Sequence, residues 1–178
     1  AAYVTSTVSA GTIGAGDYLK KHFPLMKIVA SEALQCPTLL NNGFGGHRIE
    51  GIGDKHVPWV HNAKNTDMVT AIDDEDCMRL FRLFNEPEGK TYLKSIGIDP
   101  ELVDRLELLG ISCIANLLSS IKVAKYYEMN GDDVIITLAT DSAEMYTSRL
   151  EELNAEKGPY TAMQAAKDKA AALAGAAA

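Results

Sequence analysis

Four short runs rich in β-branched residues alternate with longer stretches of helical apolar spacing, and this alternation restricts the fold more than any other feature of the sequence. The predicted strands cover Tyr3–Val8, Lys27–Ser31, Asp67–Ile72 and Asp133–Leu138. Strands that are joined by crossover helices lie parallel in one sheet. The sequence therefore predicts the α/β class, with a parallel sheet that carries helices on both faces.

The stretches with helical spacing predict four helices. They cover Thr12–His22, Asp73–Phe84, Ser112–Met129 and Glu144–Glu156. Asp73 and Asp74 are placed to cap the second helix. The third helix has an apolar face, which predicts that it lies against the sheet. This face comprises Ile114, Leu117, Leu118, Ile121 and Ala124.

Three segments lack a clear period. Glycines and Pro58 make Thr38–Asn65 a predicted loop, and a loop of that length is usually functional. Glu88–Leu109 is predicted to hold one short helix. Ala162–Ala178 has high helix propensity but almost nothing large to bury, so a frayed or disordered tail is expected.

Charge and hydropathy exclude several classes of function. The net charge of -7 and the lack of a Lys/Arg cluster argue against binding to nucleic acid or to an anionic membrane. Apolar runs such as Val134–Ala139 are far shorter than the roughly 20 residues that span a bilayer. We therefore expect a soluble cytoplasmic protein with no nucleic-acid or membrane partner.

The segment from Ser9 to Gly16 follows the first predicted strand and opens the first predicted helix. At such a junction free backbone N–H groups and the helix dipole converge on an anion. Ala10 and Gly11 would let a phosphate approach the backbone, and the hydroxyls of Ser9 and Thr12 can donate hydrogen bonds. The glycines run G-x-x-G-x-G, which is not the dinucleotide order. The alternative is an ordinary tight turn between a strand and a helix.

Two further segments could bind a ligand. Gly51 and Gly53 stand one residue apart in the long predicted loop, which suggests close approach of the backbone to a ligand or to another strand. Leu138–Tyr146 begins at the carboxyl end of the fourth predicted strand, where open α/β sheets bind ligands. In the alternative interpretation, Asp141 or Ser142 merely caps the helix that follows.

In this order and at these distances, the three segments resemble the second half of the β-family (fold type II) of pyridoxal-phosphate enzymes, the cysteine synthase and cystathionine β-synthase family. Ser9–Lys20 resembles the family's Gly/Thr-rich phosphate loop and its helix. Glu50–Pro58 resembles a stretch written Glu-Gly-Ile-Gly with a later Pro. Gly110-Ile111-Ser112 looks like the family's Gly-x-Ser helix start, and Asp141-Ser142 with Tyr146 is similar to the Asp-Ser and later Tyr of cystathionine β-synthases.

The resemblance implies pyridoxal 5'-phosphate as cofactor and gives each segment a role. It implies that the phosphate is held by Ser9, Ala10, Gly11 and Thr12. It also implies that the backbone at Gly51 and Gly53 faces cofactor and substrate, and that the Ser142 hydroxyl faces the pyridine nitrogen. A neutral hydroxyl there leaves the ring less electron-withdrawing than an Asp partner would, which favours elimination and replacement at the β-carbon over aminotransfer.

For the intact protein, the resemblance implies a lyase or transferase. It would replace or eliminate the β-substituent of serine or of an O-activated serine, with sulfide or a thiol as nucleophile, a small amino acid as substrate and a homodimer as assembly. Neither the reactive-lysine motif nor the Ser/Thr-Gly-Asn loop of the family is present, and both are expected upstream. The chain alone is therefore expected to be inactive. Residues 1–160 would be the carboxyl-terminal part of the large cofactor-binding domain, followed by an Ala-rich tail over 161–178.

Two rival functions stay open from the residues. One is a non-catalytic α/β module that binds a phosphorylated ligand or a partner chain, and the other is half of a nucleotide-binding oxidoreductase, which lacks a well-placed acidic ribose ligand. His47, His56 and His61 with Asp54 could be interpreted as metal ligands, but no i, i+4 helical pair brings two of them together. Trp59 is expected to cover apolar surface beside the glycine loop.

Overall fold

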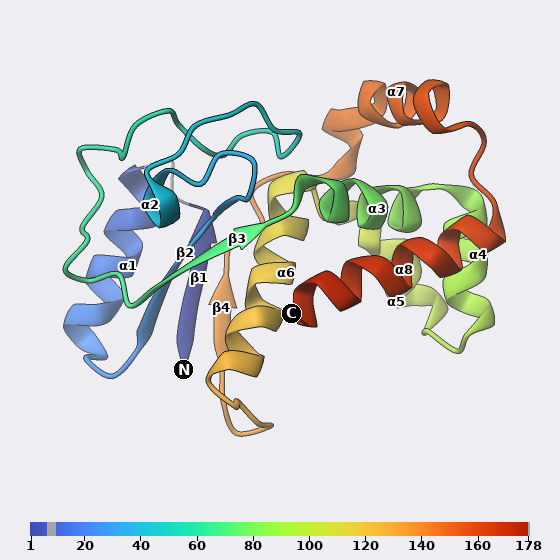
Figure 1. Ribbon diagram of the computed structural model, residues 1–178. Coiled ribbons are helices and arrows are strands. Elements are labelled where there is room, and N and C mark those ends of the chain that lie inside the picture. Colours follow the sequence, from blue (N-terminus) through green and yellow to red (C-terminus); the bar gives the residue numbers. More distant parts are fainter. Residues whose placement is uncertain (7–9, 178) are drawn as a thin grey trace.

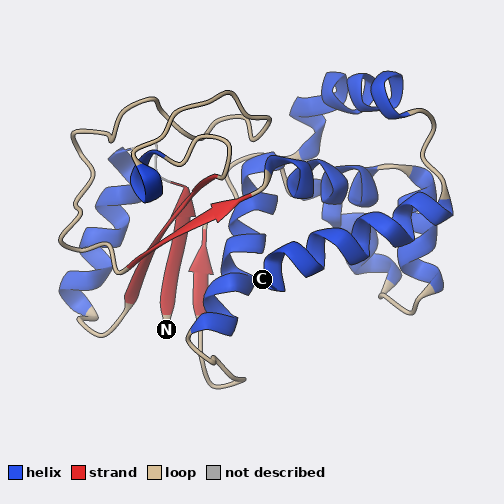
Figure 2. Ribbon diagram, in the orientation of Figure 1, coloured by secondary structure: helices blue, strands red, loops and turns tan. Residues whose placement is uncertain are grey.

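The computed structural model describes residues 1–6 and 10–177, and its centre is a sheet of four parallel strands (Figures 1 and 2). The strand order is β3-β2-β1-β4, and each neighbouring pair is parallel. The strands are β1 (Ala2–Ser6), β2 (Lys27–Ala33), β3 (Met68–Ile72) and β4 (Ile135–Thr137). The predicted α/β class and parallel sheet are confirmed.

One helix covers each face of the sheet. On one face α1 (Ala10–His22) packs over Tyr3 and Ile28, and a Cβ added to Gly16 would lie 3.3 Å from Ile28 Cγ2. Glycine at that position therefore lets α1 lie close to the strands. The long helix α6 (Ile111–Tyr126) covers the opposite face (Figure 1). The prediction of helices on both faces is confirmed.

Three buried hydroxyls fix α6 on the sheet. Ser119 Oγ of α6 lies 2.6 Å from Ser31 Oγ of β2, and Thr70 of β3 donates a hydrogen bond of 3.0 Å to the same Ser119 oxygen. Buried hydroxyls need such partners, so the three residues set the position of α6 along two strands. The predicted apolar face was wrong at Leu117, which is 38% exposed. The helix rotates so that Ser119 faces the strands and Ile114 and Leu118 enter the core.

A helical cluster beside the sheet forms the largest core (Figure 2). It contains α3 (Asp74–Asn85), α4 (Pro87–Ser95), α5 (Pro100–Arg105), the short 3-10 helix η1 (Leu106–Leu108) and α8 (Ala162–Ala177). Asp73 caps α3 by accepting a 3.0 Å hydrogen bond from the Glu75 N–H, which confirms the capping prediction for Asp73. The prediction of one short helix over 88–109 was wrong, because Pro87 and Pro100 each begin a separate helix.

The remaining helices frame the loops. The four-residue α2 (Thr38–Asn41) interrupts the long predicted loop, and the 3-10 helix η2 (Ala143–Tyr146) precedes α7 (Thr147–Lys157). Among the described residues, no single helix has the length and apolarity needed to cross a bilayer. The bent pair of Pro100–Leu108 and Ile111–Tyr126 meets that test only by length and composition.

The carboxyl-terminal segment is a packed helix, so the expected frayed or disordered tail was wrong over Ala162–Ala177. The helix α8 contacts α3, α4 and α6, and Ala165 and Ala172 are fully buried. A Cβ added to Gly175 would lie 2.2 Å from Asp76 Oδ2. The small side chains therefore allow close helix packing instead of leaving the segment without a core.

A buried arginine connects α3 to the segment between α7 and α8. Arg82 is 2% exposed, and its Nη2 donates to Asn154 Oδ1 at 2.6 Å and to the Gly158 carbonyl at 2.8 Å. Its guanidinium lies 4.6 Å from the centre of the Tyr160 ring. Tyr160 in turn donates to Asp168 of α8 at 3.0 Å. Burial and the neighbouring Asp168 carboxylate raise the pKa of Tyr160, so it remains a donor at neutral pH.

Replacing this arginine tests the connection. We expect Arg82→Met to lower the free energy of unfolding by about 3 kcal/mol, because it leaves the buried acceptors of Asn154 and Gly158 unpaired. Arg105→Met is the control, because Arg105 is largely exposed and its only described ion pair, with Glu101, spans 3.9 Å. Urea unfolding of both variants measures the difference. Equal stability of the two variants would contradict this role of Arg82.

The packing of α8 predicts the sign of a glycine substitution. Gly175→Ala should lower stability by about 1–2 kcal/mol, since the new methyl group meets the buried Asp76 carboxylate. In a frayed helix the same change would be neutral or stabilising. Gly14→Ala is the control, because nothing lies within 4 Å of a Cβ there, and it should raise stability by about 0.5–1 kcal/mol. Thermal unfolding of both variants decides, and a stabilised Gly175→Ala protein would refute the packed arrangement.

Candidate functional site

The candidate site lies where the carboxyl ends of β1 and β4 meet. These strands are neighbours in the sheet. β2 and β3 lie on one side of β1, and β4 lies on its other side. The connections after β1 and β4 therefore diverge, and open α/β sheets bind ligands at such a point. α1 follows β1, and the turn carrying Ser142 follows β4 (Figure 1). Two of the three predicted segments thus share one edge of the sheet.

The first turn of α1 has the features of a helix end that suits an anion. Ala10 and Gly11 begin this helix, and the amides at the start of an α-helix have no acceptor within the helix. The first turn holds no acidic residue, and no described residue lies within 4 Å of a Cβ added to Gly11. Thr12 donates to the Ser6 carbonyl at 3.3 Å, which ties the turn to β1. Ser9 lies outside the described residues, so its predicted contact with a phosphate stays a prediction.

A buried asparagine joins the two strand ends. Ser6 donates to Asn116 Oδ1 at 2.8 Å, and Asn116 Nδ2 donates to the Leu138 carbonyl at 3.4 Å. Asn116 is 4% exposed and comes from α6, more than a hundred positions from Ser6 in the chain. Asn116 is not among the site residues that the sequence predicts. The available signal was a polar side chain in the most apolar part of the helix.

The turn after β4 is held by the start of α6. The Gly110 N–H donates to the Asp141 carbonyl at 3.0 Å, and a Cβ added to Gly110 would lie 2.1 Å from Asp141 Oδ1. Only glycine permits this close approach. The Tyr146 hydroxyl donates to Asp141 Oδ2, and burial together with this bond raises the pKa of Tyr146. The Asp141 carboxylate is therefore already engaged within the protein.

Ser142 differs from its neighbour because its hydroxyl has no hydrogen-bond partner within the described residues. It stands at the N-cap position of η2, yet its side chain makes no capping hydrogen bond. The side chain is half-buried at the candidate site. The geometry does not support a capping role for this hydroxyl, which is thus available to a ligand.

Gly51 and Gly53 both adopt left-handed backbone conformations, with φ of 80° and 83°. Gly53 has a local explanation, because a Cβ there would lie 2.7 Å from His47 Nε2. No described residue lies within 4 Å of a Cβ added to Gly51. Glu50 forms an ion pair with Arg149 of α7, which holds the glycine segment near the turn that precedes this helix.

The long loop carries two other features that the sequence singled out, a possible set of metal ligands and Trp59. Among residues 1–6 and 10–177, no group of three or more His, Cys, Asp or Glu side chains could hold a metal ion. Trp59 is fully exposed, so the expectation that it covers apolar surface was wrong. The loop turns its indole ring outward instead, beside the exposed Val60.

Comparisons with known sequences agree on one kind of enzyme. No protein-family model matches the chain. Cysteine synthase B of Campylobacter jejuni is 30% identical over 147 residues, which cover 82% of this chain and 42% of that protein. A probable cysteine synthase of Bacillus subtilis is 28% identical over 148 residues, with 83% and 42% covered. The chain thus spans 42% of the length of these two curated relatives.

Solved structures give the same answer. The O-acetylserine sulfhydrylase isoform 3 of Entamoeba histolytica matches with a TM-score of 0.64 and 29% identity, over 83% of this chain and 39% of that chain. A hydrogen sulfide-producing enzyme of Fusobacterium nucleatum matches with a TM-score of 0.64 and 25% identity, over 94% and 44% of the two chains. The homologues of this chain are therefore cysteine synthases and O-acetylserine sulfhydrylases, which are pyridoxal-phosphate enzymes of fold type II.

Proposed function

We propose that this chain forms one side of the cofactor site in a pyridoxal-phosphate enzyme that replaces or eliminates the β-substituent of serine or of an O-activated serine. One observation carries the proposal. The first turn of α1 follows β1 and the Ser142 hydroxyl, which has no described partner, follows β4, so both stand at the carboxyl ends of neighbouring strands in a chain whose homologues are cysteine synthases. An anion-binding helix end and a neutral hydroxyl are the groups that the phosphate and the pyridine nitrogen would need.

In this proposal α1 binds the cofactor phosphate. The backbone amides of Ala10 and Gly11 donate to phosphate oxygens, and the helix dipole adds favourable potential at the same point. The open space in front of Gly11 admits the phosphate to the backbone. Thr12 keeps the turn on β1 through its bond to the Ser6 carbonyl. Ser9 would supply a further hydroxyl.

In the same proposal, the Ser142 hydroxyl faces the pyridine nitrogen of the cofactor. When bound, the cofactor supplies an electron sink for the carbanion that forms on the substrate, which permits loss of the β-substituent. The Ser142 hydroxyl orients the ring and leaves its nitrogen unprotonated. Asp141 does not compete for that nitrogen, because Tyr146 holds its carboxylate. Gly51 leaves room on its side for a small amino-acid substrate.

The proposal for the intact enzyme extends beyond this chain. Its reactive lysine and its loop for the substrate carboxylate have no recognisable motif here, so both would come from the remaining part of an enzyme like the relatives. We propose residues 1–160 as the carboxyl-terminal part of the cofactor-binding domain. The intact enzyme would be a cytoplasmic homodimer that acts on a small amino acid, with sulfide or a thiol as nucleophile.

A second candidate is a non-catalytic module that binds a phosphorylated ligand through α1. The chain spans 42% of each curated relative, and a chain of that length can form one side of the site without the other. The two candidates differ at Ser142. Only the enzyme proposal requires a ring next to that hydroxyl when the phosphate occupies α1.

A ligand without an aldehyde tests the phosphate site. We expect pyridoxine 5'-phosphate to shift the backbone amide NMR signals of both Ala10–Thr12 and Thr140–Ser142, and pyridoxine itself to shift neither. Gly11→Asp should weaken binding at least about tenfold, because its carboxylate repels the phosphate at a helix N-terminus. Gly11→Asn is the matched control, with the same shape and no charge, and should retain most of the affinity.

The outcomes separate the two candidates. Shifts confined to Ala10–Thr12, reproduced by inorganic phosphate alone, would support the binding module and contradict the enzyme proposal. Equal affinity of the Gly11→Asp and Gly11→Asn proteins would remove α1 from the phosphate site.

The role of Ser142 can be tested by stability alone. Ser142→Ala should change the free energy of unfolding by less than about 0.5 kcal/mol, since the hydroxyl makes no capping bond. Asp99→Ala is the positive control, because Asp99 caps α5 by accepting from the N–H groups of Glu101 and Leu102 at 2.7 and 3.4 Å. That variant should lose about 1 kcal/mol. If Ser142→Ala costs as much as Asp99→Ala in urea unfolding, Ser142 is a helix cap.

A further inference from the structure

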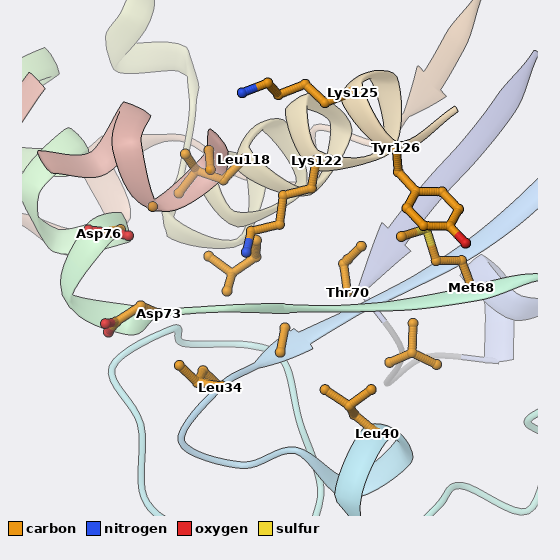
Figure 3. Close-up of a pocket in the computed structure, with 15 residues that line it drawn as sticks. Leu34, Leu40, Met68, Thr70, Asp73, Asp76, Leu118, Lys122, Lys125 and Tyr126 are labelled. Carbon is orange, nitrogen blue, oxygen red and sulfur yellow. The ribbon is translucent and has the colours of Figure 1, made fainter. Parts of the chain in front are cut away.

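A groove of about 650 Å³ runs along the outer edge of β3 (Figure 3). Strands β2 and β1 separate this edge from β4, which leads to the candidate site. All five residues of β3 line it, and β3 is hydrogen-bonded to β2 only. Side chains of α6 stand on one side of the strand, and Leu34 and Leu40 stand on the other (Figure 3). The proposed cofactor site does not use this groove.

The backbone of β3 presents unpaired groups to the groove. The Ile72 carbonyl accepts a 2.8 Å hydrogen bond from Leu34 at the end of β2. Successive residues of a strand direct their backbone groups to opposite sides, so Met68 and Thr70 also face β2. Val69 and Ala71 therefore direct their N–H and C=O groups outward. No described residue pairs with these groups, and such an edge is a template for a further strand.

The walls of the groove differ in chemistry. On the α6 side, the Lys122 side chain extends from the helix toward β3 (Figure 3), and it makes no hydrogen bond or ion pair with a described residue. Asp73 and Asp76 line one end of the groove, where Asp73 accepts from Gln35 at 2.9 Å and Asp76 from Arg79 at 2.6 Å. Lys122 also acts on the Asp76 carboxylate as a neighbouring positive charge. The opposite wall is apolar, and its Leu34 and Leu40 are 48% and 49% exposed. The groove therefore has a lysine on one wall, an apolar opposite wall and two carboxylates at one end.

We propose that this groove binds an extended acidic peptide segment of another protein, which adds to β3 as an edge strand. Side chains of a strand alternate between its two faces. A segment that alternates acidic and apolar residues would place its carboxylates toward Lys122 and its apolar side chains toward Leu34 and Leu40. Its backbone would pair with Val69 and Ala71. Main-chain hydrogen bonds supply affinity in this mode, and the alternating side chains supply specificity.

Charge favours this occupant over a second copy of the chain. If two β3 strands paired antiparallel about a two-fold axis, both α6 helices would lie on the same face of the joined sheet. The two Lys122 side chains would then lie on the same face of the joined sheet, and like charges across an interface disfavour association. An acidic segment meets the same lysine with the opposite charge.

The probe is a fluorescein-labelled six-residue peptide of alternating glutamate and valine, titrated against the 178-residue chain by fluorescence anisotropy. Lys122→Glu should weaken its binding at least about tenfold, because the attraction becomes repulsion. Lys167→Glu is the matched control on the exposed face of α8 and should change affinity less than about twofold. A peptide of alternating lysine and valine should bind Lys122→Glu more tightly than it binds the unchanged chain.

A backbone variant tests the strand addition itself. Val69→Pro removes one outward N–H and should abolish peptide binding, while the pairing of β3 with β2 is kept. A peptide with the same composition but three glutamates followed by three valines should bind at least about tenfold more weakly, since it lacks the alternation. The proposal is overturned if the alternating peptide does not bind, or if Lys122→Glu and Val69→Pro leave its affinity unchanged. It is also overturned if sedimentation shows a dimer that Val69→Pro dissociates, because the occupant is then a second copy.

Discussion

The structure depends on the contact between α6 and the sheet, and a single hydroxyl is at its centre. Ser119 is fully buried and bonds both Ser31 and Thr70, so any shift of α6 along the strands would leave buried hydroxyls unpaired. The same helix contributes Ile114 and Leu118 to the core of the helical cluster. The sheet and the helical cluster are therefore not independent, since one helix belongs to the packing of both.

α6 also connects the two candidate binding regions. Near its beginning, Asn116 joins the ends of β1 and β4, and Gly110 holds the turn that carries Ser142. One turn and a half beyond Asn116, Lys122 reaches the open edge of β3. The carboxyl edge of the sheet is closed by these polar contacts, whereas the β3 edge keeps free backbone groups. The same sheet thus offers two different kinds of surface.

The charge of the chain gives the first turn of α1 particular weight. A net charge of -7 opposes an anionic cofactor at long range, so phosphate binding must rely on local groups. The first turn has no acidic side chain. Asp17, one turn later, accepts hydrogen bonds from Asn62 and Asn65 at 3.1 and 2.7 Å, which spread its charge away from the helix end.

Local pattern determined much of the fold: the four strands, α1, and the Asp73 cap of α3 follow from apolar period and capping chemistry between residues close in sequence. Tertiary structure decided the packing of α8, where small residues do not signal that another helix lies against them.

It also decided which candidate residues are free and which are engaged. The hydroxyl of Ser142 has no described partner, whereas Tyr146 bonds the neighbouring Asp141 carboxylate. Asn116 bonds Ser6 at 2.8 Å, although the two residues lie 110 positions apart in the chain. Sequence alone determined the strands, the beginning of α3 at its Asp73 cap and the residue types at the site. Tertiary packing determined their partners, because contacts between distant segments leave no period in the chain.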